Sequence, residues 1–308
     1  MKLSEAIREF IEAKEAGFRS KKTIAKYADT LKLFAAHLGK DKTLEDITAE
    51  DVRCFLAEAR RKGLKPASLD TYYRTLQTFF NWAKAEYELS FHPMQKVEKP
   101  RLPKKMPPYL TEDKLRKLLS ASRFSKHPRR DRAILLLLFD SGIRAGELVN
   151  IKVGDVDFKG LAVKVLGKDQ EERRVPVGEM TIKAIKEYLG ERIKEREAPL
   201  FLSSKNGRAL TVSGLRQILK RLARKAGIKQ EVYPHLLRHT FAYRWIRDGG
   251  NLEKLRQIMG HSRLETTSIY AKALQKDVEE EHRRLRPADK IAEAEQLSLL
   301  CHDPGCRL

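Results

Sequence analysis

The sequence is poor in cysteine and has no long apolar segment. Its three cysteines, Cys54, Cys301 and Cys306, are too few and too unevenly spaced for a disulfide framework, which fits a reducing compartment. No run approaches the roughly 18 apolar residues that span a bilayer. The start, MKLSEAIREF, lacks the uninterrupted apolar region of a secretory signal. We therefore expect a cytoplasmic protein with no membrane partner.

Acidic residues are scarce relative to basic ones. The chain of 308 residues has 63 lysines and arginines against 42 aspartates and glutamates, which gives a net charge of +21. Pairing across the surface does not neutralise an excess of this size, so a polyanion is the expected partner.

Metal ligands are also few: CHDPGC at the end has two cysteines, but a tetrahedral site needs four ligands and no second cysteine pair exists.

The first hundred residues predict four helices packed as a small bundle. Between residues 20 and 39 apolar side chains recur every three or four positions, and a serine and a glycine bound the segment. Similar apolar faces occur at residues 3–11 and after Pro66. Another helix is expected to open at Thr48, where Thr48 and Asp51 have the spacing of a capping box.

Prolines gather in QKVEKPRLPKKMPP, residues 95–108. Four prolines and five basic residues against one acid predict an extended basic linker, because neither a helix nor a central strand can run through it. Beyond it, RDRAILLLLFDSG predicts an apolar helix ended by Gly142. DVDFKGLAVKVLGKDQEERRVPV changes to period two and predicts a small antiparallel sheet with two turns, and PLFLS predicts a further short strand.

The expected fold is therefore mainly α with a small antiparallel β-sheet, in two domains. The first covers residues 1–98 and is helical; a linker, 99–108, leads to a mixed domain, 109–288. The tail, 289–308, contains IAEAEQLSLL, which could form an amphipathic helix that docks on protein. A frayed terminus is the equally plain alternative for this tail.

The segment YPHLLRHTF places His235, Arg238 and His239 on one face of an expected helix. The arginine disfavours a metal, because a fixed cation raises the energy of a neighbouring divalent ion. It favours a phosphate, because its planar fork matches two phosphate oxygens and a histidine can donate a further hydrogen bond. Taken alone, the segment fits an ordinary helix with a surface arginine and a packed histidine equally well.

Three other segments offer the remaining parts of a phosphate site. SGIRAGEL places Arg144 after a helix end, with Glu147 near enough to orient the guanidinium. LGKDQ places Lys168 at the tip of the expected hairpin. MGHSRLETTSIYAK ends a helix before His261, restarts with a capping box, and carries Tyr270.

These segments contain five short motifs, which are Arg144, Lys168, HLLRH, MGH and TTSIYAK, and together they resemble the tyrosine recombinase or phage-integrase family, in order and in spacing. The resemblance covers about residues 1–285 and is specific as a set, whereas any single motif would be weak. Two departures are small: SGIRAGEL stands where TGLRxSEL is usual, and MGH where LGH is usual. Neither removes a catalytic side chain.

The resemblance implies that Tyr270 attacks a DNA phosphodiester, forming a 3′-phosphotyrosyl bond and releasing a 5′-hydroxyl. His235 would accept the tyrosine proton or only hydrogen-bond the phosphate, and Lys168 would protonate the departing oxygen. Arg144 and Arg238 would hold the two non-bridging oxygens. No cofactor, metal or ATP is implied.

Supporting roles fall to neighbouring residues. His261 would add a donor to the phosphate, Glu147 would orient Arg144, and His239 would have a structural hydrogen-bonding role. Basic residues elsewhere are candidate DNA contacts. Plain packing is an equal alternative for Arg74 and Lys84, and a solvated face is the alternative for Arg173, Arg174 and the linker lysines. These candidates are Arg74, Lys84, Lys99, Arg101, Lys104, Lys105, Arg173 and Arg174.

The implied partner is double-stranded DNA with a specific recombination site. The family's scheme places four protomers on two paired sites, as a homotetramer or as a heterotetramer with a paralogue. The compact length favours Xer-like chromosome dimer resolution over a lambda-like integrase with an extra arm-binding domain. The alternatives are a mobile-element integrase or excisionase, a relaxing type IB topoisomerase, and a DNA-binding regulator that has lost catalysis.

Overall fold

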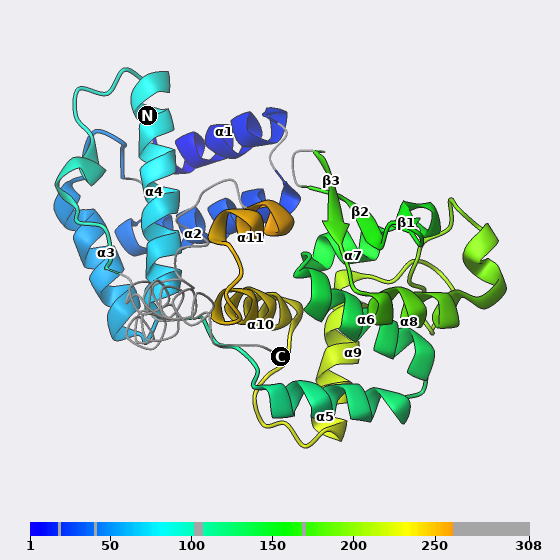
Figure 1. Cartoon of the computed structure of the whole chain (residues 1–308). Helices are drawn as coiled ribbons and strands as arrows, with labels where there is room; N and C mark the ends of the chain where they lie inside the picture. Colours follow the sequence, from blue (N-terminus) through cyan, green and yellow to red (C-terminus); the bar gives the residue numbers. More distant parts are fainter. Residues whose placement is uncertain (18–19, 40–41, 102–106, 168–170, 261–308) are drawn as a thin grey trace, which may run out of the picture. The chain divides into compact units, whose positions relative to one another are not determined.

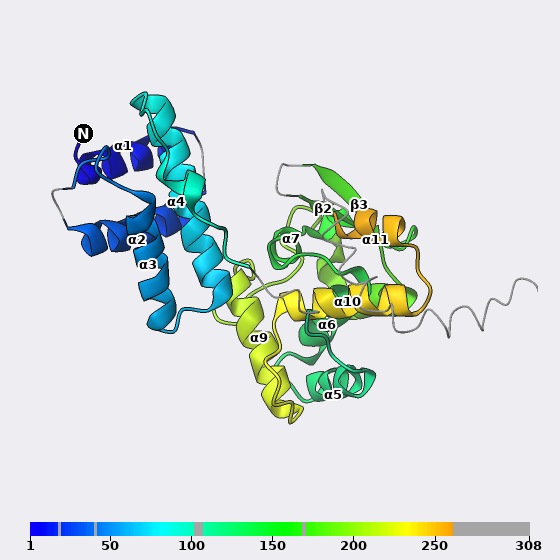
Figure 2. The ribbon, with the colours of Figure 1, turned by 90° about the vertical axis from the view of Figure 1, so that its left-hand side faces the viewer.

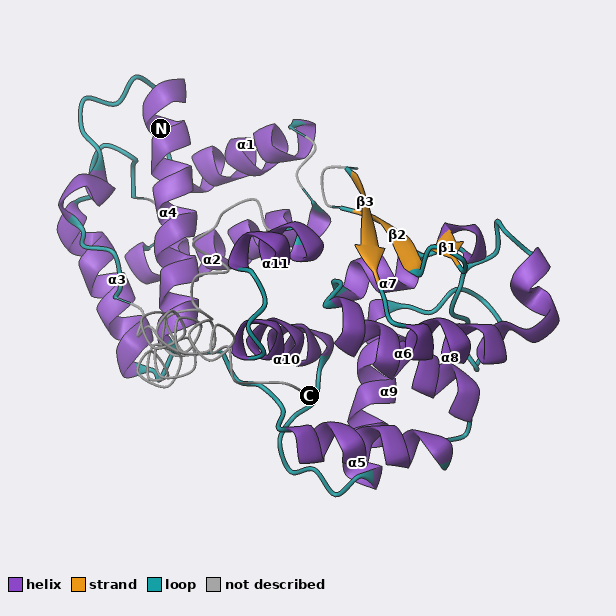
Figure 3. Ribbon diagram, in the orientation of Figure 1, coloured by secondary structure: helices purple, strands orange, loops and turns teal. Residues whose placement is uncertain are grey.

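The computed structural model describes residues 1–17, 20–39, 42–101, 107–167 and 171–260. Its chain separates into two compact units, Met1–Lys105 and Met106–Leu308 (Figure 1). Each unit has its own hydrophobic core. The structure confirms the expected fold class, since helices predominate and a single small antiparallel sheet is present in the described part of the chain (Figure 3).

The first unit is a bundle of four helices. Its aromatic core contains Phe10, Phe34, Phe79 and Phe80, all fully buried, with rings that meet edge to face. A short 3-10 helix follows the bundle. The elements are α1 (Leu3–Ala16), α2 (Lys21–Leu38), α3 (Ala49–Arg61), α4 (Pro66–Glu86) and η1 (Pro93–Lys96).

Two of these helices begin where their sequences predicted. The Ser20 hydroxyl accepts a hydrogen bond from the Thr23 amide at the start of α2. At α3, Thr48 accepts from the Asp51 amide while the Asp51 carboxylate accepts from the Thr48 amide, which is the expected capping box. These bonds satisfy backbone donors that have no partner inside the helix.

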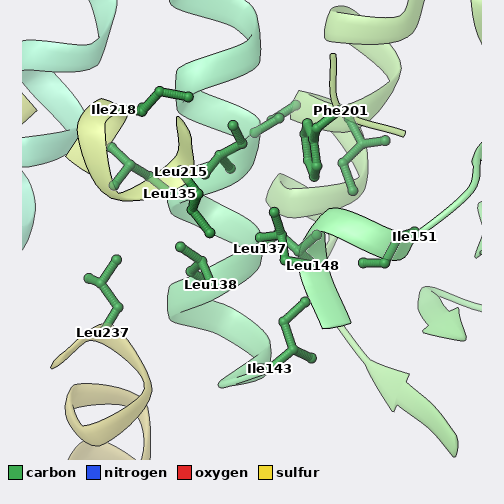
Figure 4. Packing of buried hydrophobic residues seen from close by; sticks show 14 of the residues in the cluster. Leu135, Leu137, Leu138, Ile143, Leu148, Ile151, Phe201, Leu215, Ile218 and Leu237 are labelled. Atoms are coloured by element: carbon green, nitrogen blue, oxygen red, sulfur yellow. The ribbon is translucent and has the colours of Figure 1, made fainter. Parts of the chain in front are cut away.

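The second unit packs helices around α6, whose sequence is apolar on most of its surface. Leu135, Leu137 and Leu138 are buried (Figure 4). Helix α6 contacts α5, α8 and α10. Burying such a side chain stabilises the fold by about 1.5–3 kcal/mol. The helices are α5 (Glu112–Arg123), α6 (Pro128–Ser141), α7 (Ala145–Asn150), α8 (Glu179–Leu189), α9 (Val212–Lys225), α10 (Pro234–Arg247) and α11 (Leu252–Met259), with 3-10 turns η2 (Val153–Asp155) and η3 (Gly190–Lys194).

The sheet has three antiparallel strands in chain order, as its period-two pattern predicted. They are β1 (Val156–Asp157), β2 (Ala162–Leu166) and β3 (Glu172–Pro176). Val163 pairs with Val175, and both side chains are fully buried in the core. Helix α11 lies against β3 (Figure 2), so the end of this helix and the strand are neighbours.

Gly142 ends α6 in the left-handed conformation, with φ of 59°. A β-carbon at this position would collide with the ring of Phe241 in α10. The glycine therefore serves both the backbone conformation and the close approach of α6 and α10. The sequence predicted the helix end, but not the contact with α10.

The prediction of a strand at PLFLS was wrong. The segment makes two isolated bridges, Lys152 with Pro199 and Leu202 with Ala209, and no continuous ladder. Its apolarity has another cause: Leu200 and Phe201 are buried in the core of the second unit. The two bridges, at Pro199 and Leu202, pair with different segments of the chain, and neither continues into a ladder.

Residues 261–308 lie outside the described part of the chain, and so does the predicted tail helix. Among the helices that are described, none combines the length and the apolar composition that crossing a bilayer requires.

Candidate active site

Arg238 is the buried centre of the HLLRH segment, which lies in the first turns of α10. Arg238 is only 4% exposed. One terminal nitrogen donates to the carbonyl of Gly142, and the other donates to the carbonyl of Met259 at 2.7 Å. The guanidinium therefore lies where the end of α6 meets the end of α11.

Arg144 occupies the N-cap position of α7 and is tied to Glu147. Its backbone amide donates to one carboxylate oxygen at 2.7 Å, and its guanidinium donates to the other at 2.8 Å. The second terminal nitrogen donates to the carbonyl of Gly260 at 2.7 Å. The contact between Arg144 and Glu147 is the one that the spacing of the SGIRAGEL motif predicted. The Arg144 side chain remains about one-third exposed.

Glu147 is buried and stays ionised. Burial alone would raise its pKa, but hydrogen bonds from Arg173 and Arg144 outweigh that effect and lower the pKa to about 2. At neutral pH the carboxylate is therefore a fixed negative charge between two guanidinium groups. A buried charge of this kind needs such pairing to be stable.

Arg173 corrects one expectation. Its side chain is 17% exposed, and it does not lie on a solvated face. Both terminal nitrogens donate to Glu147 at 2.8 Å, and the Nε atom donates to the carbonyl of Ile258 at 3.1 Å. Its neighbour Arg174 points to the other face of the sheet, is 62% exposed, and pairs with Asp157.

His235 and His239 have different environments on α10. His235 is exposed on the rim of a cavity, and its pKa is lowered by partial burial and by the charges of Arg238, Arg144 and Arg216. The pKa of His239 falls to about 4, chiefly because of burial and secondly because of the nearby His235. Both imidazoles are neutral at pH 7, and His235 is therefore able to accept a proton.

The cavity beside Arg144 and His235 measures about 840 Å3. Helix α9 lines it with Arg216 and Lys220, which lie four residues apart on one helical face. Both side chains are exposed, and neither was predicted from the sequence as part of the site. Their spacing was a usable signal, but α9 has basic residues on several sides, so the sequence did not show which side faces the site.

Three expected catalytic residues, Lys168, His261 and Tyr270, lie outside the described residues. The same holds for Lys104 and Lys105 of the linker. The described chain brings Arg144 and Arg238 together at the end of α11.

The basic candidates of the first unit are exposed. Arg74 on α4 binds the carboxylate of Asp70 at 2.7 Å, and Lys99 lies 3.8 Å from its other oxygen. Asp70 is itself buried, so it holds two exposed cations near one end of α4. Lys84 and Arg101 are exposed as well.

Comparison with known proteins covers both units. The model of the phage integrase family matches residues 108–277, and that of the phage integrase N-terminal SAM-like domain matches residues 8–87. Tyrosine recombinase XerD of Listeria innocua serovar 6a is 31% identical over 278 residues, 87% of this chain and 93% of the relative. Tyrosine recombinase XerC of Bacillus subtilis strain 168 is 33% identical over 261 residues, 82% and 86% of the two chains.

A solved structure, the XerH site-specific recombinase bound to difH substrate in a pre-cleavage complex, has a TM-score of 0.67 at 25% identity. The match covers 80% of this chain and 75% of the XerH chain. The motifs, the paired arginines and these matches agree, and the chain belongs to the phage integrase family of tyrosine recombinases.

Proposed function

We propose that this protein is a site-specific DNA recombinase that cuts and rejoins duplex DNA through a 3′-phosphotyrosyl intermediate. The observation that carries the proposal is the meeting of Arg144 and Arg238, which come from different helices. They donate to the adjacent carbonyls of Gly260 and Met259. Two guanidinium groups so close suit the two non-bridging oxygens of a phosphodiester, on which charge gathers in the transition state.

The remaining roles follow from the chemistry of phosphoryl transfer. Tyr270 would be the nucleophile, and a tyrosine hydroxyl with its pKa near 10 needs a proton acceptor at neutral pH. His235 fits this task because its lowered pKa leaves the imidazole neutral. Lys168 would protonate the leaving 5′ oxygen, and His261 would add a hydrogen bond to the phosphate.

The covalent intermediate conserves the energy of the broken phosphodiester. The released 5′-hydroxyl of a partner strand can therefore attack the phosphotyrosine and join new ends without ATP. Arginines supply the positive charge that a metal ion supplies in many nucleases. Cleavage should accordingly proceed in the presence of a chelator and in the absence of nucleotide.

DNA binding would involve both units. Residues 1–98 would grip the recombination site, with Arg74 and Lys84 on α4 as candidate contacts, and the linker 99–108 would add phosphate contacts. In the second unit, Arg216 and Lys220 line the cavity beside Arg144 and suit a neighbouring phosphate. The relatives named tyrosine recombinase XerC and XerD favour an Xer-like recombinase over a mobile-element integrase. The task proposed for it is the resolution of chromosome dimers by four protomers on two paired sites.

The decisive experiment uses a nicked duplex that traps the intermediate, prepared from fragments of the source genome. Wild-type protein should form a covalent adduct in EDTA, and Tyr270→Phe should bind the same DNA without forming one. Binding with no adduct on any fragment would overturn the proposal and favour a regulator that has lost catalysis. Relaxation of a supercoiled plasmid without joining of paired sites would favour a topoisomerase.

Residues 289–308 are proposed to dock on a neighbouring protomer. Deleting every residue after Ala288 should leave cleavage at a single site intact and reduce joining between paired sites. Unchanged assembly on DNA, measured by light scattering of the complex, would contradict this role for the tail.

A further inference from the structure

Three consecutive carbonyl oxygens at the end of α11 each accept a hydrogen bond from a different arginine. The pairs are Arg173 Nε with Ile258 at 3.1 Å, Arg238 Nη2 with Met259 at 2.7 Å and Arg144 Nη2 with Gly260 at 2.7 Å. The last carbonyls of a helix have no partner within it and form the negative end of its dipole. Arginines from β3, α10 and the start of α7 therefore hold one helix end, directly before His261 in the chain.

Arg173 differs from the other two arginines in what else it binds. Its two terminal nitrogens engage both oxygens of Glu147, whose same oxygens bind the amide and guanidinium of Arg144. Glu147 thus bridges Arg173 to Arg144. A bidentate pair of this geometry fixes orientation as well as distance.

Gly260 leaves room for the Arg173 guanidinium. Its φ is 62°, and a β-carbon there would lie 3.0 Å from Cζ of Arg173. The plane of the guanidinium therefore packs directly against the backbone of the residue that ends α11. Arg173 is enclosed by Glu147 on one side and by α11 on the other.

We propose that Arg173 is a positioning residue of this site, which holds Glu147, and through it Arg144, and fixes the end of α11 without contacting DNA. The proposal rests on the proposed function in one respect, namely that Arg144 binds the scissile phosphate.

Charge explains why a second arginine is needed. Glu147 carries a negative charge, and Arg144 alone would only neutralise it. With Arg173 present, two positive charges face one negative charge, so the cluster as a whole stays positive and Arg144 remains attractive to phosphate. Removing Arg173 leaves a neutral pair and allows Glu147 to draw the Arg144 guanidinium toward itself.

The first measurement is DNA affinity against salt concentration for wild type, Arg173→Gln and Arg173→Lys. Each phosphate contact contributes about 0.9 to the slope of log affinity against log salt. We expect Arg173→Lys to keep the wild-type slope, and Arg173→Gln to have that slope once Glu147→Gln in the same chain frees Arg144. A slope that stays lower by about 0.9 in this double variant would show a phosphate contact by Arg173 and overturn the proposal. This measurement needs no cleavage, so it holds even if the proposed function fails.

The second measurement is the rate of covalent adduct formation at saturating DNA. Arg173→Gln should lower this rate about 10- to 100-fold, by analogy with the loss of an outer partner that orients a metal ligand. Arg173→Lys keeps the charge but loses the bidentate geometry, so its rate of adduct formation should lie between those of wild type and Arg173→Gln. The matched control is Lys164→Gln, which removes a cation of the adjacent strand that pairs with Glu172 and Asp155 and should leave the rate unchanged.

The double variant Arg173→Gln with Glu147→Gln separates positioning from simple structural support. It removes the negative charge together with its partner, so Arg144 is again a free cation, and the rate should recover in part relative to Arg173→Gln. A double variant as slow as Arg173→Gln, or slower, would overturn the charge argument. Absence of any adduct with wild-type protein would instead overturn the proposed function.

Discussion

Arg144 and Glu147 are joined twice, through the backbone amide of Arg144 and through its guanidinium. One carboxylate therefore fixes both the first turn of α7 and the direction of the side chain that begins it. Because Arg173 binds the same carboxylate, the three residues form one charged cluster within the second unit.

Replacing Glu147 with glutamine should lower the free energy of unfolding by about 3 kcal/mol, the usual size for removing one partner of a buried ion pair. Two guanidinium groups would lose their shared carboxylate. Urea unfolding at pH 7 measures the effect. Glu172→Gln is the matched control, because Glu172 is 60% exposed, and we expect a change of no more than about 0.5 kcal/mol there. Equal unfolding midpoints for the two variants would contradict the prediction.

The rate of adduct formation should depend on pH through His235. Burial and the charges of Arg238, Arg144 and Arg216 disfavour the protonated imidazole, so its pKa lies below the ordinary 6.5. If neutral His235 accepts the tyrosine proton, the rate holds as pH falls through 6.5 and declines only at lower pH. A histidine that only hydrogen-bonds the phosphate would show no such decline.

Arg216→Gln tests the cause of that shift. Removing this cation should raise the pKa of His235 toward its ordinary value, so the decline of the rate moves to higher pH. Arg221→Gln is the control, because Arg221 lies on the same helix and outside the cavity. A profile that moves equally in both variants would indicate a general effect of charge.

Stability should fall in mild acid through His239. Its folded pKa of about 4 lies below the ordinary 6.5, so the unfolded chain binds a proton that the folded chain resists. The free energy of unfolding should decrease as pH falls from 6.5 to 4, by at most about 1.4 kcal/mol per pH unit. Urea titrations across this range should show a shallower decrease for His239→Gln. The contribution of Glu147 is lost only at lower pH, below 4.5 and toward 2.

Gly260→Ala should destabilise the protein more than Gly227→Ala. Both glycines have left-handed φ, 62° and 66°, so each alanine carries the strain of about 1–2 kcal/mol for that conformation. Only at Gly260 would the new methyl group press on Arg173, since nothing lies within 4 Å of a β-carbon at Gly227. Thermal unfolding of both variants measures the difference. An equal loss would show that Arg173 moves aside freely.

Features encoded by neighbouring residues could be predicted from the sequence. The caps at Ser20 and Thr48, the end of α6 at Gly142 and the contact of Glu147 with Arg144 all involve partners within a few positions. The local chemistry of these segments is enough to specify them.

Features that depend on distant segments could not be predicted. The residues next to Arg173 in its strand give no reason to expect a buried cation. Its role depends on Glu147, which is 26 residues away in the sequence, and on Ile258 of α11, which is 85 residues away. The side of α9 that carries Arg216 is likewise chosen by the packing of the unit. PLFLS was misassigned because burial in a core and pairing in a sheet favour the same apolar residues.

In evolutionary terms, the contact between Gly260 and Arg173 ties two positions that are far apart in the chain. A side chain at position 260 takes the space of the guanidinium, and an uncharged residue at position 173 leaves Glu147 and Arg144 as a neutral pair. A substitution at either position alone should therefore lower stability or activity. We expect relatives that lack this glycine to lack this arginine as well, and to carry an uncharged residue where this chain has Glu147.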